Sequence, residues 1–280
     1  MTGARVDVSG SLAGRLVLVT GGARGVGAAI CRAFAARGAH VIINYFHSRQ
    51  EAPKLFAELR DAGGSAELLC ASVANRDQVA AMFAGIDEKH GGLDILVNNA
   101  GAGALGGIDE IDDRYWDRAW TTDLRGSLWC AQHAAALMDK RGGGAIVNLS
   151  SVGSGSLVMQ GYSACGTAKA AVEALTRYQA AEYAPRGIRV NTATVGVLDS
   201  DVVDSVPDAS RFKAQVRKST PLANRLGSAP ELAEVVVFLA SPAASWVTGH
   251  NLVADGGLSL GVPLLSGRAW AGSEPAAVNS

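Results

Sequence analysis

The stretch Leu16-Val17-Leu18-Val19-Thr20-Gly21-Gly22-Ala23-Arg24-Gly25-Val26-Gly27 decides how the rest of the chain is interpreted. Its four apolar residues predict a short buried strand. Glycines at a Gly-x-x-x-Gly-x-Gly spacing follow, and the alanine-rich run 28–36 predicts a helix. Glycines allow a tight turn and a close backbone approach, and a helix amino terminus offers unpaired N–H groups. The stretch therefore predicts a phosphate-binding turn for a dinucleotide; the alternative is a plain tight turn.

Composition and charge limit the kinds of protein that this chain can be. With 280 residues, 48% of them hydrophobic, the chain is long enough to bury the core of one large α/β domain. The formal net charge of −1 gives no reason to expect a polyanionic partner such as a nucleic acid. No apolar run approaches the roughly 18 residues of a membrane span, and no apolar signal region precedes the first strand. We therefore expect a cytoplasmic protein.

The four cysteines are scattered through the chain, at Cys31, Cys70, Cys130 and Cys165. They form no Cys-x-x-Cys pair, and no histidine lies near them at a metal-ligand spacing. We expect reduced, mostly buried thiols and no metal site.

Strand and helix patterns alternate along the chain. Strands are predicted at 16–19, 40–45, 66–70, 94–98, 145–149, 188–191 and 251–254, and helices at 28–36, 49–62, 76–90, 114–139, 162–184 and 230–241. This alternation predicts a single α/β domain with a doubly wound parallel sheet of the Rossmann type. We expect a loose leader at 1–13, the domain at 14–260, and a tail at 261–280 that is mobile or packs on a neighbouring subunit.

Six motifs occur in an order and spacing that resemble the short-chain dehydrogenase/reductase family. They are Thr20-Gly21-x-x-x-Gly25-x-Gly27, Asn98-Asn99-Ala100-Gly101, Ser150-Ser151, the Tyr162/Lys169 segment, Val247-Thr248-Gly249 and Asp255-Gly256-Gly257. The resemblance covers about residues 12–260 and implies a nicotinamide cofactor. The positions that it and the strand ends assign to the cofactor are Gly21, Arg24, Gly25, Val26, Gly27, Asn44, Tyr45, His47, Ser48, Ser72, Val73, Asn99, Ala100, Gly101, Lys169, Gly196, Val197 and Ser200.

The residues after the second predicted strand favour NADPH as the cofactor. An enzyme that prefers NAD usually carries an acid there for the ribose 2′-hydroxyl, whereas the segment 44–49 has none before Glu51. The resemblance implies that Arg24 faces a 2′-phosphate, with His47, Ser48 and Arg49 in support, because the arginine fork matches phosphate oxygens. The alternative is that the two arginines are solvated surface residues. The family often has an acid where this chain has Ser72, which leaves the Val73 backbone to contact the adenine.

The catalytic segment departs from the family pattern Tyr-x-x-x-Lys. The flanking residues align Lys169 with the family lysine, so Cys165 stands at the usual tyrosine position and Tyr162 is the nearest tyrosine. In one interpretation the site has lost its acid. In the other, Tyr162 takes the role, because residues i and i+7 differ by only about 20° around a regular helix and the displacement along it is about 4.5 Å. A donor farther from the nicotinamide suits an α,β-unsaturated thioester, in which the hydride goes to Cβ and charge gathers on the carbonyl oxygen.

The Tyr-x6-Lys spacing is also that of the enoyl-acyl carrier protein reductases of this superfamily, and the wider sequence is most similar to the NADPH-dependent enoyl reductase III subgroup. We therefore expect an enoyl reductase in fatty-acid or polyketide synthesis. The alternatives are a ketone reductase that uses Tyr162 and an NADP-binding protein without redox turnover. The resemblance implies that Lys169 binds the nicotinamide ribose, Tyr162 donates to the enolate oxygen, and Ser151 is the serine on the substrate side.

Other positions depart from the family or suggest a substrate side. Asp123 aligns with the family's structural asparagine, and Val195-Gly196 replaces its Pro-Gly before a loop in which Ser200 lies near the nicotinamide amide. The basic run 211–218 lies where the family builds its lid and suits a phosphate-bearing acyl carrier, although a solvated helix face explains it equally well. Leu157, Val158 and Met159 are candidates to line an acyl pocket. The helices 114–139 and 162–184 resemble those that pair subunits, which predicts a homotetramer or homodimer.

Overall fold

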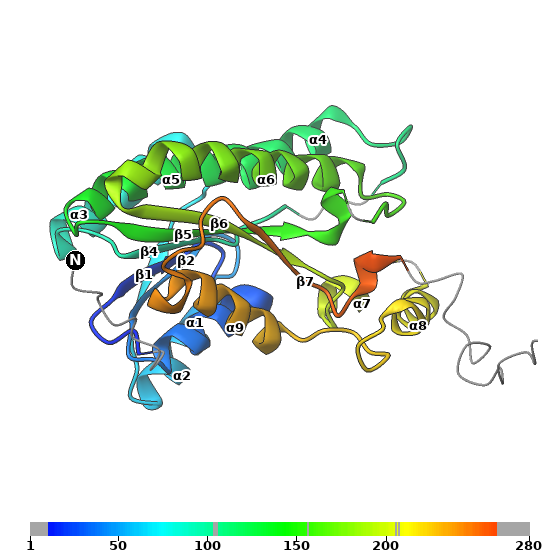
Figure 1. Ribbon diagram of the computed structural model, residues 1–280, viewed down its shortest axis with the longest axis horizontal. Helices are drawn as coiled ribbons and strands as arrows, with labels where there is room; N and C mark the ends of the chain where they lie inside the picture. The colour runs from blue at the N-terminus through cyan, green and yellow to red at the C-terminus, as the bar shows by residue number, and fades with distance from the viewer. Residues whose placement is uncertain (1–10, 103–105, 156, 205, 207, 262–280) are drawn as a thin grey trace, which may run out of the picture.

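The computed structural model describes residues 11–102, 106–155, 157–204, 206 and 208–261, and it has three layers (Figure 1). Seven parallel strands form one sheet in the order β3-β2-β1-β4-β5-β6-β7. The strands are β1 (Leu16–Val19), β2 (His40–Tyr45), β3 (Ser65–Cys70), β4 (Ile95–Asn98), β5 (Gly144–Ser151), β6 (Ile188–Val195) and β7 (Asn251–Ala254). This confirms the prediction of a doubly wound parallel sheet in a single domain.

Helices cover both faces of the sheet, as the alternating sequence pattern predicts. The α-helices are α1 (Gly25–Ala35), α2 (Glu51–Asp61), α3 (Arg76–His90), α4 (Asp113–Ala119), α5 (Gly126–Asp139), α6 (Ser163–Tyr183), α7 (Asp201–Asp204), α8 (Ala209–Ser219) and α9 (Ala229–Ala240). Helices α3, α4, α5 and α6 lie over one face, and α1, α2 and α9 lie over the other (Figure 1). Because both faces are covered, the central strand β1 is a continuous buried apolar run, and each face has its own buried cluster.

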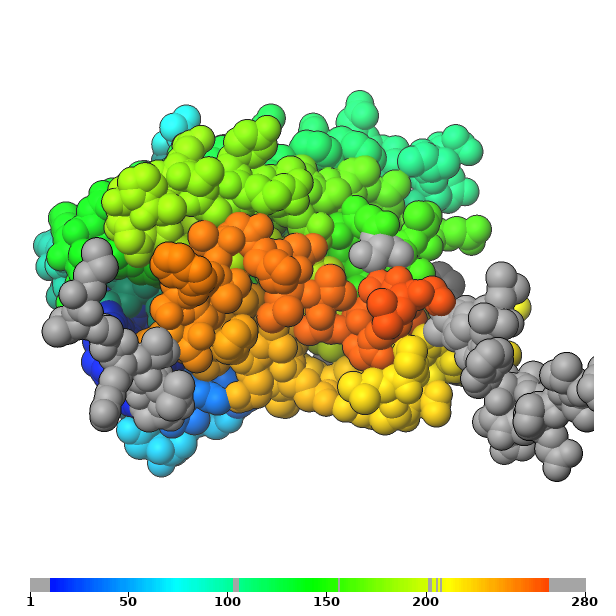
Figure 2. Space-filling model, in the orientation of Figure 1, coloured from blue at the N-terminus to red at the C-terminus, as the bar shows by residue number. Residues whose placement is uncertain are grey.

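Short helical turns complete the chain. A π-helical turn, η1 (Trp120–Arg125), joins α4 to α5, and 3-10 turns lie at η2 (Val152–Ser154), η3 (Ala184–Arg186), η4 (Pro242–Ala244) and η5 (Leu258–Leu260). Helix α8 lies beside the segment that follows β7 at one end of the molecule (Figure 2), where Val216 and Leu258 belong to a small separate apolar cluster.

The structure corrects several predicted boundaries. The single helix expected at 114–139 is interrupted by η1, in which the Gly126 N–H donates to the Thr121 carbonyl five residues back instead of four. The strand expected at 188–191 continues to Val195, because its last four residues pair with β7. The stretch between β6 and α9, left unassigned in the sequence, contains α7 and α8.

The beginning of the chain also differs from the expected loose leader. Leu12 is 2% exposed and lies in the core, and its N–H donates to the Arg37 carbonyl. The ordered domain therefore includes residues before 14. The rest of the predicted leader, residues 1–10, and the predicted tail from residue 262 lie outside the described residues.

Two general expectations concern membranes and thiols. Among the residues that the structure describes, no helix is both long and apolar enough to cross a membrane. Cys31, Cys130 and Cys165 are buried and Cys70 is exposed. Burial raises the pKa of the Cys130 thiol to about 12 and that of Cys31 further still, so these two thiols stay protonated.

Candidate active site

The glycine turn after β1 has the geometry expected of a phosphate site. Gly21 and Gly25 adopt left-handed backbone conformations, with φ values of 60° and 53°. A Cβ on Gly27 would lie 2.9 Å from the Gly22 Cα and closer still to the Gly21 carbonyl, so only glycine allows α1 to approach the turn this closely. In the described part of the chain, the side chain of the N-cap residue Arg24 makes no capping hydrogen bond, and no acid lies in the first turn of α1. Its N–H groups are therefore available to a diphosphate.

Asparagine and threonine side chains fix this turn to the neighbouring strands. The Gly21 N–H donates to Asn44 Oδ1 at 3.3 Å, while the Asn44 amide donates to the Leu69 and Ala71 carbonyls. The Asn99 amide donates to the carbonyls of Thr20 and Gly21 at 2.9 and 3.0 Å. The Thr20 hydroxyl accepts the N–H groups of Asn99 and Ala100. Asn44 and Asn99 therefore hold the turn in place, and their cofactor contacts stay predictions.

The residues predicted to select NADP lie at the carboxyl ends of β1 and β2. The register pairs Val19 with Ile43, so the two strands end side by side. Arg24 precedes α1, and the side chains of Arg24, His47 and Arg49 are exposed. Within the described chain no hydrogen bond or ion pair engages either guanidinium. Both arginines are thus available to an anion, and the assignment to a 2′-phosphate stays a prediction.

The predicted adenine contacts follow β3. The Ser72 N–H donates to the Gln78 side chain at 2.8 Å, so Gln78 occupies the backbone donor of the residue at the family's acid position. Val73 is buried, and its side chain and carbonyl pack against Gly126 at the start of α5. The contact of the Val73 backbone with the adenine stays a prediction.

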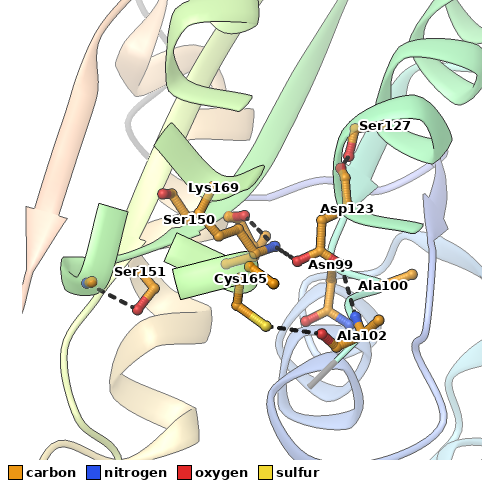
Figure 3. A network of polar contacts seen from close by, with 12 residues as sticks. Asn99, Ala100, Ala102, Asp123, Ser127, Ser150, Ser151, Cys165 and Lys169 are labelled. Atoms are coloured by element: carbon orange, nitrogen blue, oxygen red, sulfur yellow. Dashed lines mark hydrogen bonds and ion pairs between the residues drawn. The ribbon is translucent and has the colours of Figure 1, made fainter. Parts of the chain in front are cut away.

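The centre of the site is a buried ion pair between Lys169 of α6 and Asp123 of the π-helical turn (Figure 3). The two groups are 3.3 Å apart, and their side chains are 11% and 2% exposed. Lys169 also donates to the Leu149 carbonyl at 2.9 Å, and Asp123 accepts the Ala102 N–H at 2.7 Å. The wider π turn carries Asp123 into the site, and the Ser127 hydroxyl donates to the Asp123 carbonyl there. This ion pair replaces the family's asparagine and was not expected from the sequence.

Tyr162 reaches the same site, although it does so from just outside the helix. It is the N-cap of α6, with φ −107° and ψ 11°, and its carbonyl accepts the Gly166 N–H. The i and i+7 helical relation is therefore replaced by an N-cap position, because α6 begins only at Ser163. A Cβ on Gly153 would lie 2.7 Å from two carbons of the Tyr162 ring, so the ring packs on that glycine.

The Tyr162 hydroxyl is directed toward the predicted catalytic residues. Burial raises its pKa above the ordinary value, while the nearby Ser151 hydroxyl and the positive charge of Lys169 oppose the rise. The Ser151 hydroxyl also accepts the Gly153 N–H at 3.2 Å. The phenol stays protonated at neutral pH and is positioned to donate a hydrogen bond. The fold thus brings the three predicted catalytic residues, Ser151, Tyr162 and Lys169, together.

Cys165 lies at the position where the family places its tyrosine. Its side chain is buried, and its thiol donates to the Ala102 carbonyl at 3.1 Å, pointing toward the loop after β4 (Figure 3). A cluster of Ala119, Ala164 and Cys165 packs against the Tyr162 ring. A short, buried side chain therefore stands where the family has its tyrosine.

A carboxylate that the sequence analysis did not single out lies behind Ser151. Glu173 Oε1 accepts hydrogen bonds from three hydroxyls, those of Ser150, Ser154 and Thr194, at 2.6, 2.5 and 3.0 Å. It thereby connects α6 to the carboxyl ends of β5 and β6 and to the turn after β5. Glu173 lies four residues after Lys169, one helical turn along, and only the fold shows that hydroxyls surround it.

The loop after β6, which the sequence predicts to cover the nicotinamide, packs against the end of β7. Gly196 lies against Asp255, and its N–H donates to the Ala254 carbonyl. Val197 belongs to the apolar cluster that includes Phe212 of α8. The Ser200 hydroxyl is 3.5 Å from the Leu198 carbonyl and stays a predicted cofactor contact.

The predicted substrate side is only partly as expected. Lys213 of the basic helix α8 pairs with Asp199 and Asp204 at 2.6 and 2.7 Å, so this charge is neutralised within the protein. Val158 is 94% exposed and lines no pocket in the described chain. Leu157 packs with α8, and a Cβ on Gly153 would lie 2.6 Å from the Met159 methyl, which places Met159 beside Tyr162.

The fold and this site define an oxidoreductase, and comparison with known proteins identifies its family. The family model described as Enoyl-(Acyl carrier protein) reductase matches residues 21–259. The chain belongs to the short-chain dehydrogenase/reductase family.

Individual relatives differ in the reactions that their names describe. The chain is 37% identical over 254 residues to a 1-cyclohexenylcarbonyl-CoA reductase of Streptomyces collinus, covering 88% of this chain and 87% of that one. It is 36% identical over 241 residues to the 3-oxoacyl-[acyl-carrier-protein] reductase FabG of Staphylococcus aureus, covering 86% and 96%. The structure of a gluconate 5-dehydrogenase from Burkholderia cenocepacia in complex with NADP and tartrate matches with a TM-score of 0.85 and 34% identity, covering 90% and 98%.

Proposed function

We propose that the protein is an NADPH-dependent reductase of an α,β-unsaturated acyl thioester or a related enone. The observation that carries this proposal is the position of Tyr162, which lies close enough to Ser151 and Lys169 for both to oppose the rise of its pKa, while Cys165 occupies the usual tyrosine position. The Streptomyces relative, whose name describes reduction of a cyclohexenylcarbonyl-CoA, supports the same class of substrate.

The residues of the site have distinct roles in this reaction. A bound NADPH would supply the hydride, which adds to Cβ of the substrate. Negative charge then gathers on the carbonyl oxygen, where the Tyr162 hydroxyl donates a hydrogen bond. Cα takes a proton, with Tyr162 or water as the donor, so the net change is addition of two hydrogens. Lys169 binds the nicotinamide ribose and, as a cation, favours the developing tyrosinate. Asp123 orients Lys169 from the other side of the ammonium.

The glycine turn and its neighbours fit a dinucleotide. The uncapped amino terminus of α1 suits the diphosphate, and Gly101 borders the Lys169–Asp123 pair closely enough that an added Cβ would lie 3.7 Å from the Lys169 ammonium. The exposed Arg24 supports NADPH over NADH, because a guanidinium binds a phosphate through paired, charge-assisted hydrogen bonds.

A ketone reductase is the second candidate. Ser151 lies near enough to Tyr162 to affect its pKa, and two hydroxyl donors close together suit a ketone oxygen next to the hydride acceptor carbon. The name of the Staphylococcus relative, which describes a 3-oxoacyl substrate, favours this candidate. An acyl chain on a phosphate-bearing carrier is common to both candidates, as are a homotetramer or homodimer and a cytoplasmic location.

Following NADPH absorbance with crotonyl- and acetoacetyl-thioesters distinguishes these functions. We expect oxidation with the crotonyl substrate, and mass spectrometry should show a gain of two hydrogens in the product. Oxidation with acetoacetyl-thioester alone would replace the proposal with the ketone reductase. NADPH binding by calorimetry without turnover on either substrate would favour a cofactor-binding protein without redox activity.

The cofactor preference has its own test. Arg24→Ala should raise the KM for NADPH about 10- to 100-fold, because it removes charge-assisted hydrogen bonds to the 2′-phosphate. The KM for NADH, which has no such phosphate, should stay unchanged. Arg118→Ala, which removes another exposed arginine on α4, is the control. Equal effects of Arg24→Ala on both cofactors would contradict the assignment of Arg24.

A further inference from the structure

Three residues far apart in the sequence meet at the amino ends of β2 and β3, away from the active site. They are His40 at the start of β2, Glu67 in β3, and His90 at the end of α3. One ligand atom from each, an imidazole nitrogen or a carboxylate oxygen, lies within 4.8 Å of the others. We propose that these three side chains bind a divalent transition-metal ion of the Zn²⁺ class.

The backbone explains why the three side chains converge. The parallel register pairs Ile42 of β2 with Glu67 of β3. Because His40 lies two residues before Ile42, the side chains of His40 and Glu67 point to the same face of the sheet. Ile42 is buried on the face that α3 covers. Helix α3 ends at His90, where Gly91 turns the chain with a φ of 67°. The side chain of His90, at the end of α3, therefore lies over β3 and β2, the two outer strands at this edge of the sheet.

The state of His40 gives an independent reason to expect a cation. Its Nδ1 lies 2.6 Å from the Ser65 hydroxyl, whereas its buried Nε2 has no hydrogen-bond partner in the described chain. With the proton on Nδ1 and donated to Ser65, Nε2 presents a lone pair, and Glu67 Oε1 is 4.0 Å from it. In that tautomer the lone pair is available to a cation that lies between it and the carboxylate. A hydrogen bond on the far nitrogen is also the usual support of a metal-bound imidazole.

The distances and charges fit a zinc-type ion with modest adjustment. Ligand atoms around a tetrahedral zinc are about 3.3 Å apart, given metal bonds of about 2.0–2.1 Å, and here His90 Nε2 lies 2.8 Å and His40 Nε2 4.0 Å from Glu67 Oε1. The side chains of His40, Glu67 and His90 are 30%, 17% and 18% exposed, which leaves a coordination position open to water.

The surrounding charges affect the binding in opposite directions. Lys89 pairs with the other oxygen, Glu67 Oε2, and Arg60 also contributes positive charge near His40. Both disfavour a cation, although Lys89 is 64% exposed and leaves Oε1 available. The carboxyl end of α3 favours a positive charge at this point. The bound ion would tie the edge strands β2 and β3 to α3, so it would stabilise the fold without entering the reaction.

Metal binding to the purified full-length protein tests this proposal. After incubation with Zn²⁺ and gel filtration, elemental analysis should find one zinc per chain, and thermal unfolding should shift upward with Zn²⁺ but not with Mg²⁺, which prefers oxygen ligands. His40→Gln and His90→Gln should each weaken Zn²⁺ binding by at least about tenfold. Ser65→Ala, which keeps all three ligands, should weaken it less, and His250→Gln, which removes an exposed histidine elsewhere, should leave it unchanged.

The competing outcomes are distinct. Unfolding curves recorded without metal identify any variant that fails to fold, and such a variant is replaced by Glu67→Gln. Zinc binding that is equal in the wild type, His40→Gln and His90→Gln would overturn the proposal, as would a wild type that binds no zinc at micromolar concentrations. Visible absorption of bound Co²⁺ that is the same in all variants would also contradict a site made by these residues.

Discussion

Replacing Tyr162 with phenylalanine removes one oxygen atom from the centre of the proposed mechanism. The ring should keep its packing against Gly153 and Cys165, and the Ser151 hydroxyl should keep its bond from the Gly153 N–H. We therefore expect the free energy of unfolding to change by no more than about 1 kcal/mol, the net value of one hydrogen bond. Turnover should fall by about 10²–10³-fold, because the donor to the developing oxyanion is lost.

Cys165→Ala is the matched control. The Cys165 thiol is buried and donates to the Ala102 carbonyl at 3.1 Å, so its loss leaves a small cavity and an acceptor without its donor. We expect a loss of about 1–2 kcal/mol in unfolding free energy. Turnover should stay within about threefold, because the thiol points toward Ala102 and makes no contact that forms only in the transition state.

Tyr162→Phe should therefore lower turnover more than Cys165→Ala does, whereas Cys165→Ala should lower the free energy of unfolding more than Tyr162→Phe does. The assay measures NADPH oxidation under saturating conditions with the thioester that the wild type reduces, and urea unfolding supplies the stabilities. Comparable losses of turnover in both variants would refute Tyr162 as the donor. Full activity of Tyr162→Phe would refute it independently of Cys165.

Three further predictions concern the turn, the ion pair and a helix cap. Gly27→Ala should destabilise the protein by about 1–3 kcal/mol in urea unfolding, because its Cβ would collide with Gly22 and Asn99. Gly85→Ala is the control, because Gly85 is an exposed residue of α3 with open space for a Cβ. It should stabilise the protein by about 0.5–1 kcal/mol. Asp123→Leu should cost about 3–5 kcal/mol because it leaves Lys169 without its buried partner, and Asp123→Asn, which still accepts the Ala102 N–H, should cost less by the same measurement. Arg225 and Ser228 lower the pKa of Glu231 to about 2, so the stability that this carboxylate contributes is complete above pH 4.5 and disappears as the pH falls toward 2. Because Glu231 is half exposed, the contribution is only about 0.5–1 kcal/mol, and acid titration of Glu231→Gln should lack that component; an identical acid profile in the variant would contradict the cap.

The sheet and its order of helices could be predicted because they depend on local patterns. Four apolar residues before a glycine turn, and their counterparts in six further strands, carry the strand signal without knowledge of any contact. The glycine turn was also predictable, since glycine adopts the left-handed conformation of Gly21 more readily than other residues and only glycine fits the close approach at Gly27. The π turn was not predictable, because α4 and α5 have a continuous helical pattern and the extra residue shows only in the hydrogen bonds.

The sequence by itself determined the family, the glycine turn after β1 and the three candidate catalytic residues, because each lies in a short motif with its own stereochemical requirement. Only the tertiary structure decided that Asp123 pairs with Lys169 and that Tyr162 lies before α6 instead of within it. It also decided that Glu173 accepts hydrogen bonds from three hydroxyls. The meeting of His40, Glu67 and His90 likewise depends on strand register and on where α3 ends. The physical reason is that a side chain's partners are set by the packing of elements distant in sequence, which leaves no periodic pattern along the chain.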